Sequence, residues 1–221
     1  MVTQESVKPA TAHDPSIEPL VTSVVTHEWR QFQNTSNEGG RASCQNNWPM
    51  FFQMRTSQFL TWPHDLLSSY EDDLERAEHV GRNLVTEKYA RMMESTDPVA
   101  FDRDIRGFIP PLGESRVELQ ERIIAVQVRW AGDFRGQYPH LGAAMRVLRT
   151  AQDTIDDTSF ETYLRGELGT YSDRTLSLYA RFIEDIETRR GNLTRDTIEN
   201  TVKLAGFSDL DEAEMAQKDS A

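Results

Sequence analysis

Apolar residues in this chain recur at steps of three and four, the spacing that lines one face of an α-helix. The first clear run contains Leu20, Val21, Val24, Val25, Trp29 and Phe32. Sustained alternation of apolar and polar residues, which is typical of half-buried strands, is nearly absent, and no Asn-Gly hairpin turn occurs. We therefore predict an all-α protein, an irregular bundle of about eight helices in a single domain.

Segments rich in turn-forming residues separate the predicted helices. Two of them, at 34–47 and 107–115, are dense in Gly, Pro, Asn and Ser and are expected to be loops. Pro63 is expected to end one helix, and Gly81 offers a break in the helical pattern that follows.

Local signals also set the expected ends of the domain and of single helices. Ser115 and Glu118 are spaced as a capping box at the start of a long helix. A shorter helix is expected near 141–152. From periodicity and composition we predict three regions: a flexible N-terminal tail at 1–15, a helical domain at 16–212 and a flexible C-terminal tail at 213–221.

The charge of the chain excludes several kinds of partner. Its formal net charge is −12, from 36 acidic and 24 basic residues, and no cluster of Lys and Arg offers a cationic face. Nucleic acid and anionic membrane surfaces are therefore not expected partners. Cys44 is the single cysteine, and no apolar run reaches the roughly 18 residues of a membrane span. We expect a cytoplasmic protein without an internal disulfide.

A Glu-x-Tyr-x-Arg pattern occurs twice, at 87–91 and 161–165. A spacing of four places each glutamate and its arginine on one helical face, where they can pair. The tyrosine between them lies about 200° around the helix from the glutamate. A surface ion pair worth a few tenths of a kcal/mol is the simplest interpretation of either motif alone.

The two motifs would form one shared site if their helices faced each other inside the bundle. Up to four carboxylates and two guanidinium groups would then share a cavity, and their mutual influence would separate the pKa values of an acid and a base. The catalytic candidates are Glu87, Glu161, Tyr163 and Glu167. A buried salt-bridge network that needs no substrate is the alternative, and it stays open.

Other segments give weaker indications of a functional site. The glycine-rich loop before Arg41 lacks the Lys-Ser/Thr pair of a phosphate-binding loop, so it is a weak nucleotide signal. Cys44 has no evident histidine partner in the sequence. No Glu-x-x-His pair occurs, and a single cysteine excludes a zinc site of the cysteine type. A magnesium site at 72–75 is conceivable, but a solvated acidic face is favoured, so no metal or other cofactor is expected.

Four stretches together resemble the family known as domain of unknown function 4125. They are GGRASCQ (39–45), MRTSQFLTW (54–62), GRNLVTEKYARMMEST (81–96) and ETYLRGELGTYS (161–172). The resemblance covers most of residues 20–212 and implies no established activity. Its motifs fall on Arg41, Gln45, Arg55, Gln58, Trp62, Asn83, Glu87, Tyr89, Arg91, Glu161, Tyr163, Arg165, Glu167 and Tyr171.

These residues support two hypotheses of different classes. The first is a cofactor-independent acid–base enzyme, of lyase, cyclase, isomerase or hydrolase type, that acts on a small polar or cationic metabolite. The second is a non-catalytic binding or partner module whose Glu-x-Tyr-x-Arg motifs form a structural salt-bridge network; a homodimer is left open. The expected ligand-binding residues are Arg41, Gln45, Arg55, Gln58, Trp62, Asn83, Tyr89, Arg91, Arg165 and Tyr171.

Overall fold

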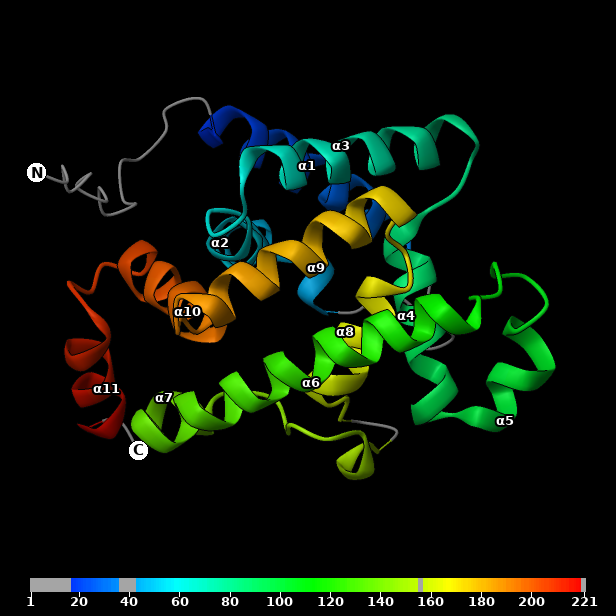
Figure 1. Ribbon diagram of the computed structural model, residues 1–221. Coiled ribbons are helices and arrows are strands. Elements are labelled where there is room, and N and C mark those ends of the chain that lie inside the picture. The colour runs from blue at the N-terminus through cyan, green and yellow to red at the C-terminus, as the bar shows by residue number, and fades with distance from the viewer. Residues whose placement is uncertain (1–16, 36–42, 155–156, 220–221) are drawn as a thin grey trace, which may run out of the picture.

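The protein is all-α in a computed structural model that describes residues 17–35, 43–154 and 157–219 (Figure 1). This part of the chain contains eleven α-helices and no strand, where the sequence predicted about eight. The extra ones include two very short helices, α5 and α7. The helices are α1 (Ile17–Gln33), α2 (Trp48–Phe59), α3 (His64–His79), α4 (Leu84–Thr96), α5 (Pro98–Ala100), α6 (Glu114–Gln137), α7 (Pro139–Ala143), α8 (Phe160–Leu168), α9 (Asp173–Thr188), α10 (Leu193–Leu204) and α11 (Leu210–Asp219).

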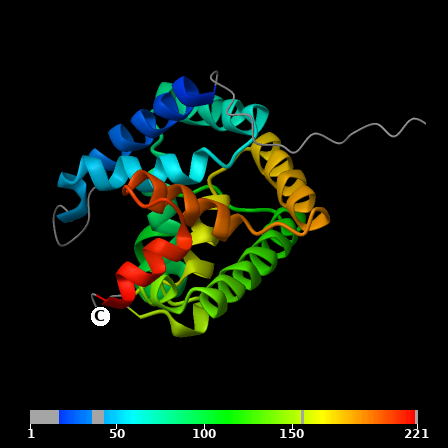
Figure 2. The same ribbon diagram turned by 90° about the vertical axis from the view of Figure 1, so that its left-hand side faces the viewer.

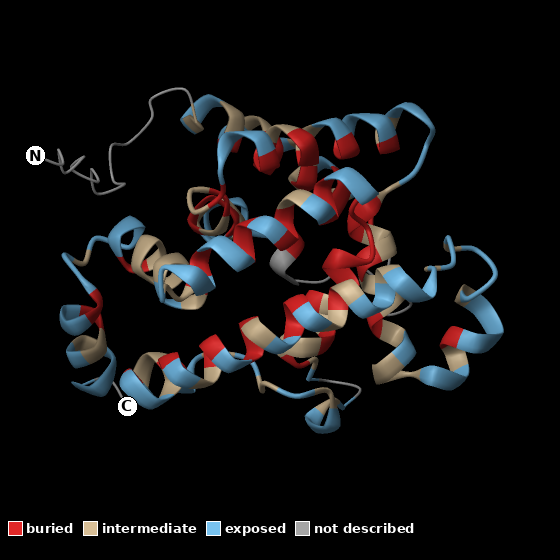
Figure 3. Ribbon diagram, in the orientation of Figure 1, coloured by how far each residue is buried: buried red, intermediate tan, exposed pale blue. Residues whose placement is uncertain are grey.

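The helices surround a core that draws on both halves of the chain. Helices α1 and α3 lie side by side, and α9 packs against α3 (Figures 1 and 2). Helix α8 lies between α4 and α6 and contacts both of them. Buried residues gather on the inward faces of these helices, while their outer faces are exposed (Figure 3). None of the described helices is both long enough and apolar enough to cross a membrane.

Capping side chains and a glycine explain why several helices begin or end where they do. The Asn83 side chain accepts a hydrogen bond from the Thr86 amide at the start of α4, and Ser172 does the same for Thr175 at the start of α9. Gly81 has a φ of +74° in the turn between α3 and α4, a conformation that glycine adopts readily. The break predicted at this glycine is therefore confirmed.

Two predicted boundaries are wrong. The Ser115–Glu118 capping box does not form, because α6 begins two residues earlier and has Gly113 as its N-cap without a side-chain hydrogen bond. The helix expected at 141–152 ends at Ala143. The chain then runs beside the start of α8, where the amide of Phe160 donates to the Val147 carbonyl. These tertiary hydrogen bonds replace the ones that a longer helix would have made.

The C-terminal tail predicted from residue 213 is helical up to Asp219. Leu210 and Ala213 of α11 are buried in a second apolar cluster with Phe134 and Tyr138. Glu214 adds a polar contact, since its carboxylate accepts hydrogen bonds of 2.8 Å from two amides at the start of α7. Packing against α6 and α7 therefore orders a segment whose composition alone looks like a tail. The predicted N-terminal tail, 1–15, lies outside the described residues.

Two glycines allow α8 to approach α4 closely. A Cβ atom on Gly166 would lie 2.8 Å from the Lys88 carbonyl oxygen and 2.9 Å from Cγ of Met92. A Cβ on Gly169, just after α8, would lie 2.5 Å from Cδ of Arg91. The absence of both side chains brings the second motif helix directly against the first, so the two Glu-x-Tyr-x-Arg segments do lie on neighbouring helices.

Candidate functional site

A network of buried polar side chains links five helices at the centre of the fold. Its members come from α1, α2, α3, α4 and α8, together with the turn that follows α8. They are Glu28, Arg55, Gln58, Tyr70, Lys88, Glu167 and Tyr171. Two glutamates face one arginine and one lysine, so the charges within the network balance.

One half of the network is the pair between Glu28 and Arg55. Nε and one terminal nitrogen of Arg55 each donate to a Glu28 carboxylate oxygen at 2.6 Å, which is a bidentate contact. The hydroxyl of Tyr70 donates to the same carboxylate at 2.8 Å. Glu28 and Arg55 are 4% and 8% exposed, so this pair is sealed from solvent.

The other half is centred on Glu167. Its carboxylate accepts hydrogen bonds from Lys88 Nζ at 2.5 Å, from Gln58 Nε2 at 3.0 Å and from the Tyr171 hydroxyl at 3.0 Å. Arg55 also reaches it, with both nitrogen–oxygen distances at 3.4 Å. Four donors therefore satisfy one buried carboxylate, which is what a charge in the interior requires.

The electrostatics of this network keep its carboxylate ionised and its phenols neutral. Burial by itself would raise the pKa of Glu167, but the charges of Arg55 and Lys88 and their hydrogen bonds hold it well below its ordinary value. Burial, followed by the charge of Glu167, raises the pKa of Tyr171 well above its ordinary value. Glu167 is therefore a poor proton acceptor and Tyr171 a poor acid near neutral pH.

Two aromatic residues named from the sequence pack against this network. Nζ of Lys88 lies 3.7 Å from the ring centre of Tyr163, a cation–π contact. Trp62 is 2% exposed and meets the Tyr171 ring edge-on, with the ring centres 6.1 Å apart. Its indole nitrogen has no hydrogen-bond partner among the described residues. Trp62 is therefore part of the hydrophobic core.

The glutamates of the repeated motif do not join this network. Glu87 pairs with Arg82 through two contacts of 2.7 and 2.8 Å, instead of pairing with Arg91 four residues later. Glu161 accepts from the Thr150 amide at 2.8 Å and lies 3.6 Å from Arg165. The expected cavity shared by four carboxylates and two guanidinium groups does not form, because α4 and α8 contact each other through Gly166 and Lys88 instead.

The remaining predicted binding residues have local structural contacts. Arg165 forms its shortest ion pair with Glu121 of α6, at 2.6 Å. Gln45 donates to two backbone carbonyls at 2.7 and 2.9 Å, and Asn83 caps α4. Tyr89 lies near Phe32, with the ring centres 6.3 Å apart. The last predicted binding residue, Arg41, lies outside the described residues.

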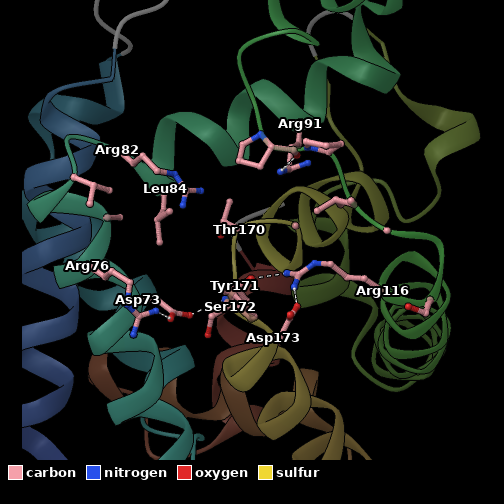
Figure 4. A pocket seen from close by; sticks show the side chains of 18 residues that line it. Asp73, Arg76, Arg82, Leu84, Arg91, Arg116, Thr170, Tyr171, Ser172 and Asp173 are labelled. Carbon is pink, nitrogen blue, oxygen red and sulfur yellow. Dashed lines mark hydrogen bonds and ion pairs between the residues drawn. The ribbon is translucent and has the colours of Figure 1, made fainter.

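A pocket of about 630 Å³ opens beside the network, among α3, α4, α6 and the turn between α8 and α9 (Figure 4). Two of the residues named from the sequence, Arg91 and Tyr171, line it. The four basic residues of the lining are all arginines, whereas its acidic residues are two aspartates. In full these charged residues are Arg76, Arg82, Arg91, Arg116, Asp73 and Asp173.

The arginines of this pocket differ in how far they are neutralised. Arg76 and Arg82 each face a carboxylate, and Arg116 pairs with Asp173 at 2.7 Å. Arg91 instead donates to the Pro110 carbonyl at 2.8 Å and forms no ion pair with a described residue. The buried Nε atoms of Arg91 and Arg116 have no hydrogen-bond partner there either.

The surroundings of Arg91 disfavour its charged form. Burial lowers its pKa, Glu87 acts in the opposite direction, and the neighbouring charges of Arg116 and Arg82 lower it further. An arginine remains charged at neutral pH even so. The pocket therefore contains a guanidinium group that forms no ion pair with any described residue.

Comparison with known proteins gives one match. The family model described as "Protein of unknown function (DUF4125)" matches residues 18–215, which is most of the chain. The chain belongs to the DUF4125 family. No curated protein and no solved structure matches it.

Among the motif residues of this DUF4125 protein, Arg55, Gln58, Glu167 and Tyr171 lie in the network, and Arg91 and Tyr171 line the pocket. Sequence reasoning missed three residues of the network: Glu28, Tyr70 and Lys88. A signal for them exists, because each lies within the apolar stripe of its helix; Lys88 falls four residues after Leu84 and four before Met92, which are both buried. A charged residue in the middle of such a stripe indicates a buried partner.

No metal centre emerges from the described part of this DUF4125 chain, which contains no group of three or more His, Cys, Asp or Glu side chains arranged to hold an ion. Asp73, one of the acidic residues considered for magnesium, accepts from Arg76 at 3.3 Å and from the Ser172 amide at 2.8 Å. The arginines that surround it favour anions over cations.

Proposed function

We propose that this protein is a binding module for a small organic anion, which occupies the arginine-lined pocket between α3, α4, α6 and the turn after α8. The observation that carries the proposal is Arg91, a partly buried guanidinium group at the edge of a pocket of about 630 Å³, with no carboxylate partner in the part of the chain that the structure describes. Guanidinium groups bind carboxylates and phosphates through paired, charge-assisted hydrogen bonds.

The charge of the whole chain strengthens this proposal. A protein with a net charge of −12 repels anions over most of its surface, so four arginines around one pocket concentrate positive charge at a single place. The sequence had suggested a polar or cationic ligand because of its acidic stripes. The arginines of the pocket favour an anion, and we revise the expected sign of the ligand accordingly.

The buried network supports a binding module over an acid–base enzyme. Its carboxylates are sealed, and Glu167 is held ionised by four donors, so it has no free position from which to take a proton. Paired charges of this kind specify how helices assemble without needing a substrate. We propose that the network organises the fold and that the adjacent pocket binds the ligand.

Two-dimensional NMR of the full chain with inorganic phosphate tests this proposal. We expect phosphate to shift the backbone amide signals of 169–173 and of Arg91, and Arg91→Gln to weaken binding by about tenfold or more. Arg181→Gln, which changes an exposed arginine of α9 away from the pocket, is the matched control and should bind phosphate as the wild type does. Shifts spread over the surface, or equal binding by both variants, would contradict the proposal.

A further inference from the structure

The pocket has positive charge at two opposite sides. Arg76 of α3 and Arg82 of the following turn lie on one side, and Arg116 of α6 lies on the other (Figure 4). Arg91 of α4 lies above the turn that contains Thr170, toward the side of Arg116. A single compact anion near Arg116 would leave the α3 side without a ligand group.

On the α6 side, Arg116 pairs with Asp173 at 2.7 Å, whereas Arg91 has no ion-pair partner among the described residues. Burial lowers the pKa of Arg91, and the charge of Arg116 lowers it further. The Nε atoms of both are buried without a partner among the described residues. Arg116 is held in place by carbonyl oxygens of Leu168 and Tyr171 at 3.0 and 2.5 Å, so its orientation is fixed before any ligand arrives.

The α3 side is partly neutralised. Arg82 shares a bidentate pair with Glu87, and Arg76 lies 3.3 Å from Asp73, whose other oxygen accepts from the Ser172 amide. These arginines are largely exposed, and they can add a hydrogen bond to a ligand without leaving their partners, since each guanidinium group has five N–H donors. This side is suited to a second, weaker anion contact.

Part of the pocket lining is apolar, while Ser115, Thr170 and Ser172 contribute hydroxyl groups elsewhere in it. Ala77, Val80 and Leu84 line the pocket beside α3 and α4, and Pro110, Pro111 and Leu112 line it from the loop before α6. These residues offer no strong polar partner to the middle of a ligand. They would instead contact a hydrocarbon or similarly apolar spacer.

From this arrangement we infer that the ligand carries two anionic groups joined by a short apolar spacer, the first bound by Arg91 and Arg116 and the second by Arg76 and Arg82. The inference rests on the proposed function and narrows its ligand class. It explains why arginines from α3, α4, α6 and a turn converge on one pocket, and why Arg91 has no ion-pair partner among the described residues.

Titration calorimetry with a series of phosphonates tests the inference on the full chain. The probes are methylphosphonate, which has one anionic group, and straight-chain alkane bisphosphonates with spacers of increasing length. We expect one spacer length to bind at least about tenfold more tightly than methylphosphonate, because the second contact becomes intramolecular once the first has formed. Shorter and longer spacers should bind more weakly than this optimum.

Variants assign the two anionic groups to their sides. Arg82→Gln should weaken the best bisphosphonate by a larger factor than it weakens methylphosphonate. Arg76→Gln provides a second test of the same side and does not disturb the pair with Glu87. Arg91→Gln should weaken both kinds of probe, and Arg181→Gln should weaken neither.

The outcomes separate the inference from the proposed function. If methylphosphonate binds at the pocket and every bisphosphonate binds equally well, the two-ended ligand is wrong while the anion site stands. If no phosphonate and no phosphate binds, both proposals are wrong. If Arg82→Gln weakens methylphosphonate as much as the bisphosphonates, the assignment of separate sides is wrong.

Discussion

Single buried charges in this protein are tolerated because each one is fully partnered. Glu167 is 3% exposed and receives hydrogen bonds from four side chains that belong to two helices and a turn. Removing one partner from such a group leaves other charges buried without compensation, which costs more than the net value of the interaction. Glu167 is therefore the residue whose replacement should matter most for stability.

We predict that Glu167→Gln lowers the free energy of unfolding by about 3–5 kcal/mol, because Lys88 and Arg55 keep their charges in the interior without this counter-ion. Urea denaturation followed by circular dichroism measures the change. Glu184→Gln, at an exposed position of α9, is the matched control and should stay within about 0.5 kcal/mol of the wild type. A variant of Glu167 as stable as the control would show that the network contributes little.

The same carboxylate should make stability depend on pH. The pKa of Glu167 is lowered in the folded state, whereas an unfolded glutamate titrates near about 4.3. The contribution of Glu167 to the free energy of unfolding is therefore complete above that pH. It is lost as the pH falls toward the lowered pKa of the folded state. Denaturation measured between pH 3 and 7 should show this loss, and the profile of Glu167→Gln should be flatter on the acid side.

At the scale of elements, the closest helix contact depends on a missing side chain. Gly166 lies against the backbone of α4 at Lys88, where a Cβ atom would be 2.8 Å from a carbonyl oxygen. The carbonyl belongs to the helix backbone and cannot rotate away. Adding even a methyl group must separate α4 from α8, and the same separation would stretch the hydrogen bond between Lys88 and Glu167.

We predict that Gly166→Ala destabilises the protein by about 1–3 kcal/mol, although alanine favours helix more than glycine does. Gly132→Ala in α6 is the control, because its Cβ would meet only Cδ1 of Leu148 at an ordinary 3.9 Å. That variant should gain up to about 1 kcal/mol. Thermal denaturation of both proteins gives the comparison, and equal effects would argue against a tight α4–α8 contact.

The order of α11 likewise depends on its packing. Leu210 is 3% exposed against Phe134 and Tyr138, while Leu204 at the end of α10 is 49% exposed. We predict that Leu210→Ala costs about 2–5 kcal/mol and that Leu204→Ala costs much less. Unfolding curves for the two variants measure the difference. If Leu210→Ala left the free energy of unfolding unchanged, the packing of α11 would contribute nothing. The C-terminal segment would then behave as the flexible tail that the sequence suggested.

At the scale of the whole molecule, the net charge of the chain is negative, whereas the pocket is lined by four arginines. A chain with 36 acidic and 24 basic residues gathers four arginines around one opening, and one of them has no carboxylate partner among the described residues. Burial and the charges of Arg116 and Arg82 lower the pKa of Arg91, so its charged form is disfavoured in the unliganded protein. Binding sites commonly carry such a cost to stability.

We therefore predict that Arg91→Gln abolishes most anion binding without lowering the stability of the unliganded protein. The free energy of unfolding should stay within about 0.5 kcal/mol of the wild type or rise, since a repelled cation is removed and glutamine can still donate one hydrogen bond. Chemical denaturation in a buffer without phosphate or other multivalent anions measures this. A loss of more than about 1 kcal/mol would mean that Arg91 is chiefly structural.

The sequence by itself determined the class of fold and the break between α3 and α4. Apolar spacing and the glycine at 81 act within a few residues, so they can be recognised in a linear chain. The sequence also identified Arg55, Gln58, Glu167 and Tyr171 as candidate site residues, and these four residues are joined by hydrogen bonds. Their partners were not recognisable from spacing alone.

Only the tertiary structure decided which charges pair and where the pocket lies. Glu87 bonds to Arg82 in the preceding turn instead of to Arg91 on its own helix, and Lys88 reaches Glu167, which is 79 residues away. The arginines of the pocket likewise come from α3, α4, α6 and a turn. Periodicity reports the face of a helix that is buried, but the partner of that face follows from the packing of all the helices together, and here from the space left by two glycines.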